Sequence, residues 1–299
     1  MKSKNIGTKS KWWLISLSFI IYHLTSLTLV TTRPIKRACW LSLLLMLSFS
    51  PAGAQDLPRS TVTYQLGSGS TNLLDTYLSQ EKFSGPGLTF LSTVEREEPG
   101  SLWSTRLEHQ VNYANVSDRT DSRNELEGDY SFLMGRLRRW DLQHGWNVQA
   151  GALASGTIGF IYNTANSNNP AQARLFFNLM PTGTVSKSFR LWRKSWQARY
   201  ELNLPVVGVM FSPNYGQSYY EIFSLSNYDH NIVATTVVNA PSLRHELTIG
   251  CALRPYTMLT LGYLGDYQQA KVNNLKSHVY THRVMIGIVR QFSIIRHKL

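Results

Sequence analysis

The sequence predicts an all-β protein: a transmembrane antiparallel β-barrel of about ten strands, with twelve as the alternative count, that follows a cleaved signal peptide. Three observations predict the barrel: long segments of alternating apolar and polar residues, tryptophans at one set of strand ends, and connections that alternate between short and long. Period-two alternation is typical of strands, and aromatic residues gather where a barrel meets the membrane interface. After residue 55, no apolar stretch approaches the roughly 18 residues that a spanning helix needs.

The N-terminal segment predicts export. Residues 33–37 hold three basic side chains, residues 38–49 are mostly apolar, and Ala52-Gly53-Ala54 provides a small-x-small cleavage site. These are the three parts of a signal peptide. We therefore expect the mature chain to begin at Gln55.

A second apolar run, at residues 12–30, precedes the signal. It is either an extra membrane anchor or the mark of a start codon placed too early, with Val30 or Leu29 as the true start; we favour the early start. The expected domains are then residues 1–29 as an over-extended start or leader, 30–54 as the signal peptide, 55–292 as the barrel, and 293–299 as a periplasmic tail.

The net charge of +12 comes largely from the leader. Residues 1–54 hold seven Lys and Arg and no acid, which leaves 23 basic residues against 18 acidic ones, or +5, for the rest. So small a charge on a membrane protein predicts no nucleic-acid partner. Cys251 is the only cysteine after residue 54, so no intrachain disulfide is expected in the mature chain.

The strands are placed by alternation and by the turns between them. We expect them at residues 60–67, 86–95, 102–114, 125–137, 145–162, 171–189, 196–211, 243–253, 258–268 and 279–292.

The connections predict the orientation. Long connections of outer-membrane barrels face the outside and short ones face the periplasm, and an even strand number returns both termini to the periplasm. The five tryptophans of the mature chain then lie on the periplasmic side: Trp103, Trp140, Trp146, Trp192 and Trp196. The short connections are 96–101, 138–144, 190–195 and 254–257, and the long ones are 68–85, 115–124, 163–170, 212–242 and 269–278.

Alternation also assigns the two faces of each strand. A ten-strand barrel is narrow enough for side chains to fill it, and buried charges must pair. A filled, salt-bridged interior is therefore favoured over an open, selective pore. The charges expected to line the lumen are Arg106, Glu108, Glu127, Asp129, Arg199, Glu201, Arg244, Glu246 and Arg283.

The last expected strand resembles the C-terminal signal by which barrels are recognised for assembly. Val284, Ile286, Ile288 and the terminal aromatic Phe292 share one face. Two features depart from that signal: Arg290 stands at an apolar position, and residues 293–299 continue past the aromatic. The resemblance implies the barrel assembly machinery as a partner, beside the lipid of the outer membrane.

No metal, cofactor or catalytic set is expected. His278 and His282 are four residues apart in a strand, which separates them by roughly 13 Å, too far to share one ion. A barrel hydrolase of the omptin kind would need further acids facing Asp229-His230, and Asp266 is the only candidate. A phospholipase would need Ser, His and Asn together on the lipid-facing wall, and the sequence does not assemble that trio.

The connection at 212–242 is too long for a simple turn. Tyrosine-rich adaptable surfaces suit recognition, while packing across the barrel mouth as a lid is an equally supported role. The residues expected to carry recognition of a small-molecule or protein ligand are Tyr215, Tyr219, Tyr220, Tyr228, Asp229 and His230.

Several idiosyncratic strings resemble an uncharacterised family of outer-membrane barrels from Gram-negative gut and oral bacteria, catalogued as a domain of unknown function. The strings are 77–78, 83–87, 160–163, 168–174, 204–220, 227–231 and 271–278. The resemblance implies a barrel fold and an outer-membrane location, and it implies no activity. The sequence thus predicts a non-enzymatic binding or structural barrel, with a narrow porin-like channel for small solutes and a surface hydrolase as alternatives.

Overall fold

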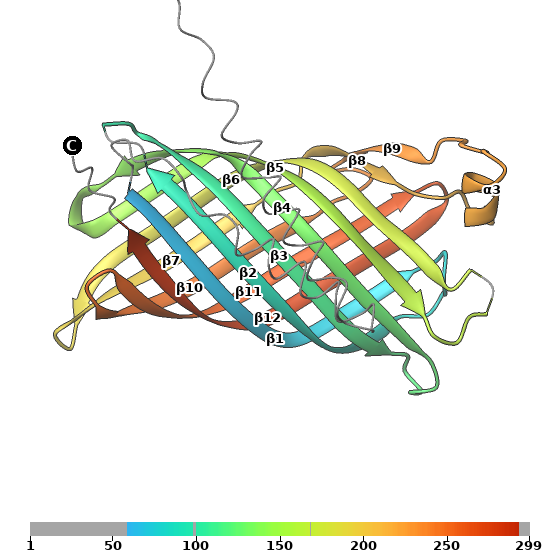
Figure 1. Cartoon of the computed structure of the whole chain (residues 1–299), viewed down its shortest axis with the longest axis horizontal. Helices are drawn as coiled ribbons and strands as arrows, with labels where there is room; N and C mark the ends of the chain where they lie inside the picture. Colours follow the sequence, from blue (N-terminus) through green and yellow to red (C-terminus); the bar gives the residue numbers. More distant parts are fainter. Residues whose placement is uncertain (1–58, 98–99, 168, 293–299) are drawn as a thin grey trace, which may run out of the picture. The chain divides into compact units, whose positions relative to one another are not determined.

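The computed structural model describes residues 59–97, 100–167 and 169–292 (Figure 1). The chain divides into two units, residues 1–54 and 55–299. The first unit lies outside the described residues, as do the predicted cleavage site and the predicted tail at 293–299. Within the described part of the chain, no helix is both long and apolar enough to cross a membrane.

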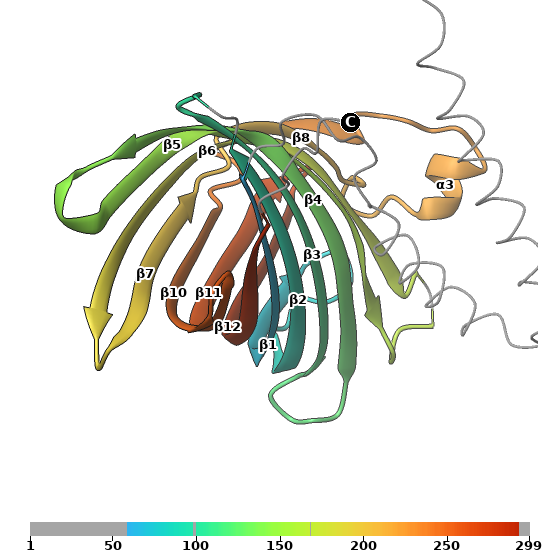
Figure 2. The ribbon, with the colours of Figure 1, turned by 60° about the vertical axis from the view of Figure 1, so that its left-hand side comes forward.

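Ten antiparallel strands close into a barrel, which confirms the predicted fold class and strand count (Figures 1 and 2). Strands that are neighbours in sequence pair, β7 pairs with β10, and β1 pairs with β12 to close the wall. The wall strands are β1 (Arg59–Asp75), β2 (Phe83–Glu97), β3 (Trp103–Ser117), β4 (Asn124–Asp141), β5 (Trp146–Asn163), β6 (Ala171–Leu191), β7 (Lys194–Asn203), β10 (Leu243–Arg254), β11 (Thr257–Val272) and β12 (Leu275–Phe292).

The predicted seventh strand is interrupted at Pro205. Proline has no N–H to give to a ladder, and the register of β6 shifts by one residue between β7 and the short strand β8 (Val207–Phe211). This bulge moves the outward face from Leu204 to Val207. β8 then pairs with β9 (Ile232–Thr236), which forms a hairpin beyond the end of β10.

The first strand is longer than predicted. The glycine and serine run from Gly67 suggested a loop from residue 68, but β1 continues to Asp75. A small residue is required inside this strand, because a Cβ at Gly69 would lie 2.1 Å from the backbone carbonyl oxygen of His282 on β12. The connection predicted at 68–85 is therefore only residues 76–82.

The predicted long connection at 269–278 is wrong. β11 and β12 continue to a two-residue turn made by Asn273 and Asn274, with φ of 49° and 59°. Positive φ at both positions is the requirement of the hairpin turn that matches strand twist, and asparagine tolerates it. The polar residues on either side belong to strands.

The predicted loop at 212–242 contains regular structure. It holds strand β9, so the connection between β8 and β9 spans only residues 212–231. This connection contains the short helix α3 (Tyr219–Phe223). Ser218 caps the helix: its Oγ accepts the backbone N–H of Glu221, and the Glu221 carboxylate accepts the N–H of Ser218. This capping box satisfies two donors that a helix start leaves unpaired.

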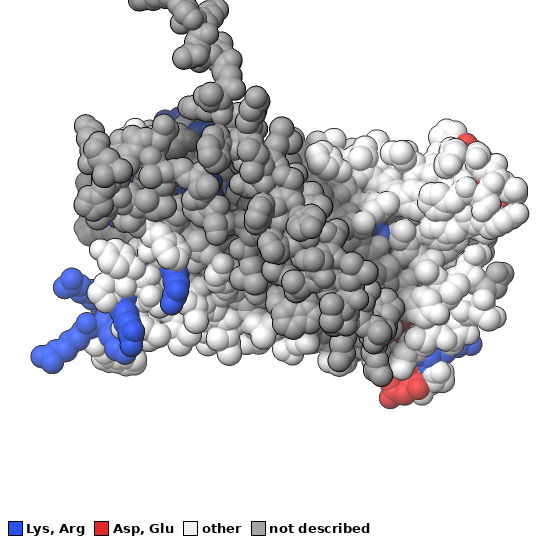
Figure 3. All heavy atoms as spheres, viewed as in Figure 1, with Lys and Arg blue, Asp and Glu red and all other residues white. Residues whose placement is uncertain are grey.

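The two faces of the wall differ in polarity. Outward residues such as Leu66 and Ile286 are 62% and 60% exposed, whereas the inward Arg106 and Glu125 are fully buried. A soluble barrel has the opposite arrangement, so this exterior is the apolar surface that a bilayer requires. In Figure 3 the visible charged side chains gather at the two ends of the barrel, and the visible wall between the ends is almost free of them.

Candidate functional site

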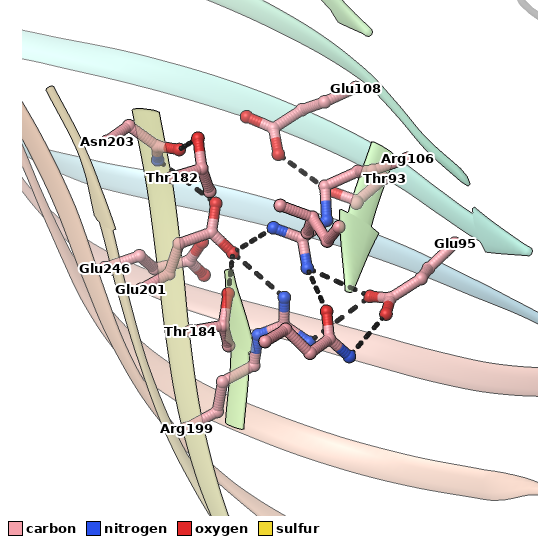
Figure 4. A network of polar contacts seen from close by, with 12 residues as sticks. Thr93, Glu95, Arg106, Glu108, Thr182, Thr184, Arg199, Glu201, Asn203 and Glu246 are labelled. Atoms are coloured by element: carbon pink, nitrogen blue, oxygen red, sulfur yellow. Dashed lines mark hydrogen bonds and ion pairs between the residues drawn. The ribbon is translucent and has the colours of Figure 1, made fainter. Parts of the chain in front are cut away.

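The inward charges of β2, β3, β7 and β10 meet in the middle of the barrel (Figure 4). We call this set the central charge network. Each member stands on an inward position because side chains alternate across a strand, and each is taken from water, so it needs a partner of opposite sign. The members are Glu95, Arg106, Glu108, Arg199, Glu201 and Arg244.

Arg106 lies at the centre of this network. Its Nη1 is 2.6 Å from Oε2 of Glu201, and its Nη2 is 3.0 Å from Oε2 of Glu95. Arg199 contacts the same two carboxylates, at 2.9 Å from Glu201 and 3.5 Å from Glu95. Two arginines and two glutamates therefore share a set of charge-assisted hydrogen bonds.

A second contact spans the full width of the barrel. Nη2 of Arg244 on β10 is 2.5 Å from Oε1 of Glu108 on β3, and its Nε donates to Oε1 of Gln110 on β3 at 3.0 Å. Four strands separate β3 from β10 in either direction around the wall. The two strands face each other across the lumen, so this pair bridges the widest part of the interior.

The other predicted lumen charges also lie on the inner face. Glu246 accepts a hydrogen bond from Gln65 at 2.7 Å. Arg283 is 1% exposed and donates to the hydroxyls of Thr89 and Thr71 and to a backbone carbonyl.

Arg174 is a further inward charge, and it was not among the predicted lumen residues. Its Nη1 is 2.5 Å from Oε1 of Glu127 and 3.4 Å from Oδ2 of Asp129. Glu127 and Asp129 are thereby joined to β6. The sequence pattern could have indicated that Arg174 points inward, because Gln172 and Arg174 alternate with apolar residues at the start of the predicted strand 171–189.

Buried apolar side chains cluster at the loop end of the lumen. We call this set the mouth cluster, and it joins strands β1, β2, β3, β5 and β12 with the β1–β2 connection. Its members are Leu73, Leu78, Phe83, Ala114, Val116, Ile161 and Val279, with Tyr77 packed against them.

Helix α3 packs against this mouth through Tyr219. The Tyr219 ring makes an edge contact with Tyr77 at 5.7 Å between centroids and stacks with Phe223 at 6.0 Å. Its hydroxyl donates to Oε1 of Gln172 at 2.8 Å and accepts the backbone N–H of Ala173 at 2.7 Å. Burial raises the pKa of this hydroxyl above its ordinary value. Tyr219 therefore fastens the helix to the barrel mouth, and we call residues 212–231, which include α3, the lid.

The remaining predicted recognition residues are on the outer side of this lid. Tyr215, Tyr220 and Tyr228 are 68%, 65% and 63% exposed. Asp229 and His230 are hydrogen-bonded to each other and are also exposed. The predicted set therefore splits into one residue that holds the lid and five that face the medium.

Two separate cavities lie on either side of the central charge network. The loop-end cavity has a volume of about 80 Å³ and is lined by Arg174, Asp266 and Arg244 among others. The cavity at the end that carries the termini has a volume of about 450 Å³ and is lined by Glu95 and Arg199. Arg106, Glu108 and Glu201 line neither cavity, because they fill the space between them.

The predicted third acid of an omptin-like site is elsewhere. Asp266 is 6% exposed and accepts hydrogen bonds from Gln110 and Gln268 inside the barrel, whereas Asp229 and His230 are in the exposed loop. Among the described residues, no group of three or more His, Cys, Asp or Glu is placed to hold a metal ion. No arrangement in this part of the chain gives positive support to catalysis.

The polar, filled interior and the apolar exterior define an outer-membrane β-barrel. Residues 38–299 match the family described as Protein of unknown function (DUF3316), and the chain belongs to this family. No curated protein matches the chain.

Solved structures of bacterial outer-membrane proteins are similar to this chain in fold. The outer membrane protease OmpT from Escherichia coli is 8% identical, with 82% of this chain and 99% of that chain covered and a TM-score of 0.45. An outer membrane channel from Pseudomonas putida F1 is 9% identical, with coverages of 82% and 100% and a TM-score of 0.36. Neisserial surface protein A is 9% identical, with coverages of 78% and 97% and a TM-score of 0.32. The protease and channel activities in these names belong to those proteins.

Proposed function

We propose that this protein is a non-conducting, non-enzymatic outer-membrane barrel that binds a partner through its extracellular surface. The observation that carries the proposal is the contact of 2.5 Å between Arg244 and Glu108, which joins two opposite sides of the wall. A lumen bridged across its width by buried side chains, with one cavity on either side of the bridge, supports a closed interior.

The loop end supports the binding role. Tyr215, Tyr220, Phe223 and Tyr228 each expose more than 60% of their surface on one connection, and Ile232 beside them exposes 77%. Exposed apolar and aromatic groups of this density are typical of interaction surfaces. The same connection is fastened to the mouth by Tyr219, so the surface is presented on a fixed base.

Conductance of the refolded protein in planar bilayers tests the closed lumen. We expect no unitary current steps from the wild-type chain. A variant with Arg106→Ala and Arg244→Ala that also lacks residues 213–230 should conduct, because both the network and the lid are removed. Reproducible steps from folded wild-type protein would overturn the proposal in favour of a small-solute channel.

A glycan and peptide array tests the binding surface. We expect the labelled, refolded wild-type protein to bind a defined subset of the array. The triple variant Tyr220→Ser, Phe223→Ser and Tyr228→Ser should lose that binding while keeping its fold. Binding that is unchanged in the triple variant, or absent from the wild type, would contradict the role given to this surface.

A further inference from the structure

The outward face of the barrel carries a row of cations near the chain termini. We call this set the basic belt: Arg96 on β2, Arg136 and Arg138 on β4, Lys187 on β6 and Arg290 on β12. Arg136 and Arg138 follow the exposed Met134 at steps of two, and the intervening Leu137 is fully buried. They therefore point away from the lumen.

Three of these cations lie over indole rings. Lys187 Nζ is 4.8 Å from the centre of the Trp146 ring, to which it is also paired in register. Arg138 Cζ is 5.4 Å from the Trp140 ring, and Arg136 Cζ is 5.8 Å from the Trp103 ring. Cation–π contacts hold the charged groups on the outer surface.

The acidic residues of the described strands do not share the outward face of the belt. Every Asp and Glu of the described strands is on an inward position. Glu97, for example, forms an ion pair at 2.6 Å with Arg139, which also points inward. In the described part of the chain, neither Arg138 nor Lys187 makes a salt bridge. The outward face of the described strands at this end therefore carries only positive charges.

The depth of the belt is that of lipid headgroups. Trp103, the register partner of Arg138, and Tyr113 are the two exposed aromatic residues of β3. Ten residues of a strand tilted by about 40° rise roughly 25 Å, which is the height of the apolar band of a barrel. The belt is thus at the interface on the side of the termini and the short turns, which is the periplasmic side.

We propose that the basic belt binds the phosphate groups of anionic phospholipids in the periplasmic leaflet. Arginine forms paired hydrogen bonds with phosphate oxygens, and indole rings beside it cover the glycerol and upper acyl region. Each cation near an anionic lipid surface is worth about fivefold in affinity. The ligand is the lipid headgroup rather than free phosphate, because the belt lies on the lipid-facing side of the wall, at the edge of the apolar band.

Quenching of tryptophan fluorescence by brominated lipids tests this binding, because the indoles lie beside the cations. The refolded chain is placed in phosphatidylcholine bilayers that contain either brominated phosphatidylglycerol or brominated phosphatidylcholine. We expect the wild type to prefer the anionic lipid by about fivefold or more. The variant Arg138→Gln with Lys187→Gln should show a preference close to one.

The matched control removes the same charge from the opposite end. Lys82→Gln with Lys276→Gln should keep the wild-type preference, since both residues are at the loop end. If the first pair fails to fold, Arg96→Gln with Arg290→Gln tests the same belt. Equal quenching by both lipids, a preference retained in the belt variant, or displacement of the brominated lipid by inorganic phosphate or lipid A would each overturn the proposal.

Discussion

Arg106 shows how single residues close this lumen. Alternation alone puts it on the inner face, so its burial is a consequence of local sequence. The ion-pair partners of Arg106 could not be predicted from the sequence. Glu201 is 95 residues away and reaches Arg106 only once the wall has closed. Arg174 illustrates the same limit: its strand was predicted, but nothing local indicates that it joins Glu127 to β6.

Arg106→Ala should destabilise the barrel by about 3 kcal/mol or more, because it leaves two buried carboxylates with less compensation. Arg139→Ala is the matched control. Its side chain is 24% exposed and pairs with Glu97 and Asp141 at the rim, so its loss should cost about 1 kcal/mol or less. Urea unfolding of the refolded proteins measures both. Equal losses would show that the centre of the barrel is as well hydrated as its rim.

Among the structural elements, the strands of this chain are more predictable from its sequence than the connections. Strand faces depend on a period of two, which is visible locally. The ends of strands were placed wrongly where a strand contains residue types that are common in loops. This happened at the glycine and serine run from Gly67 and at the polar segments around Asn273. In both places the reason is tertiary: close contact with β12 in the first, and a tight turn in the second.

Helix α3 should respond to acid through Glu221. Hydrogen bonds from the backbone N–H and hydroxyl of Ser218 hold the pKa of Glu221 below its usual value of 4.5. Because the folded pKa is the lower one, the ionised carboxylate stabilises the helix above pH 4.5, and this contribution is lost as the pH falls through the folded value. The methyl signal of the buried Ile222 in NMR spectra should shift in this range.

Glu221→Gln should abolish this titration of the Ile222 signal. Asp229→Asn, on the exposed part of the same connection, should leave it unchanged. An Ile222 signal that is constant down to pH 3, or that titrates equally in Glu221→Gln, would contradict the link between the capping box and the lid.

On the scale of the whole molecule, the strand number and the return of both described ends to one side follow from the sequence pattern. The pattern could not predict how the interior is packed, since the mouth cluster draws on five strands at once. A count of ten strands predicts a narrow lumen, but only the packing of particular side chains fills it.

Phe292 should carry the assembly signal. Its side chain is 45% exposed on the outward face, in line with Ile288 and Ile286. Phe292→Asp should greatly reduce the amount of the folded form in cells, seen as a band that shifts on heating before SDS electrophoresis. A single carboxylate near the interface costs only about 1 kcal/mol or less, so refolding in vitro should be nearly unchanged.

Deletion of residues 293–299 is the companion experiment. The truncated chain should still give the heat-shifted band, because the tail follows the aromatic residue that ends β12. If the truncation abolishes the band and Phe292→Asp does not, the recognition signal is in the tail.

The pairing of β1 with β12 has a consequence for how the protein is made. Asn72 and His278 touch although 206 residues separate them, and the two strands match along almost their whole length. A chain that stops before its last strand leaves two bare edges, each able to pair with another chain. Because β12 is the last strand, the barrel can close only after the whole chain has been synthesised and exported. Only the closed barrel has no free strand edge.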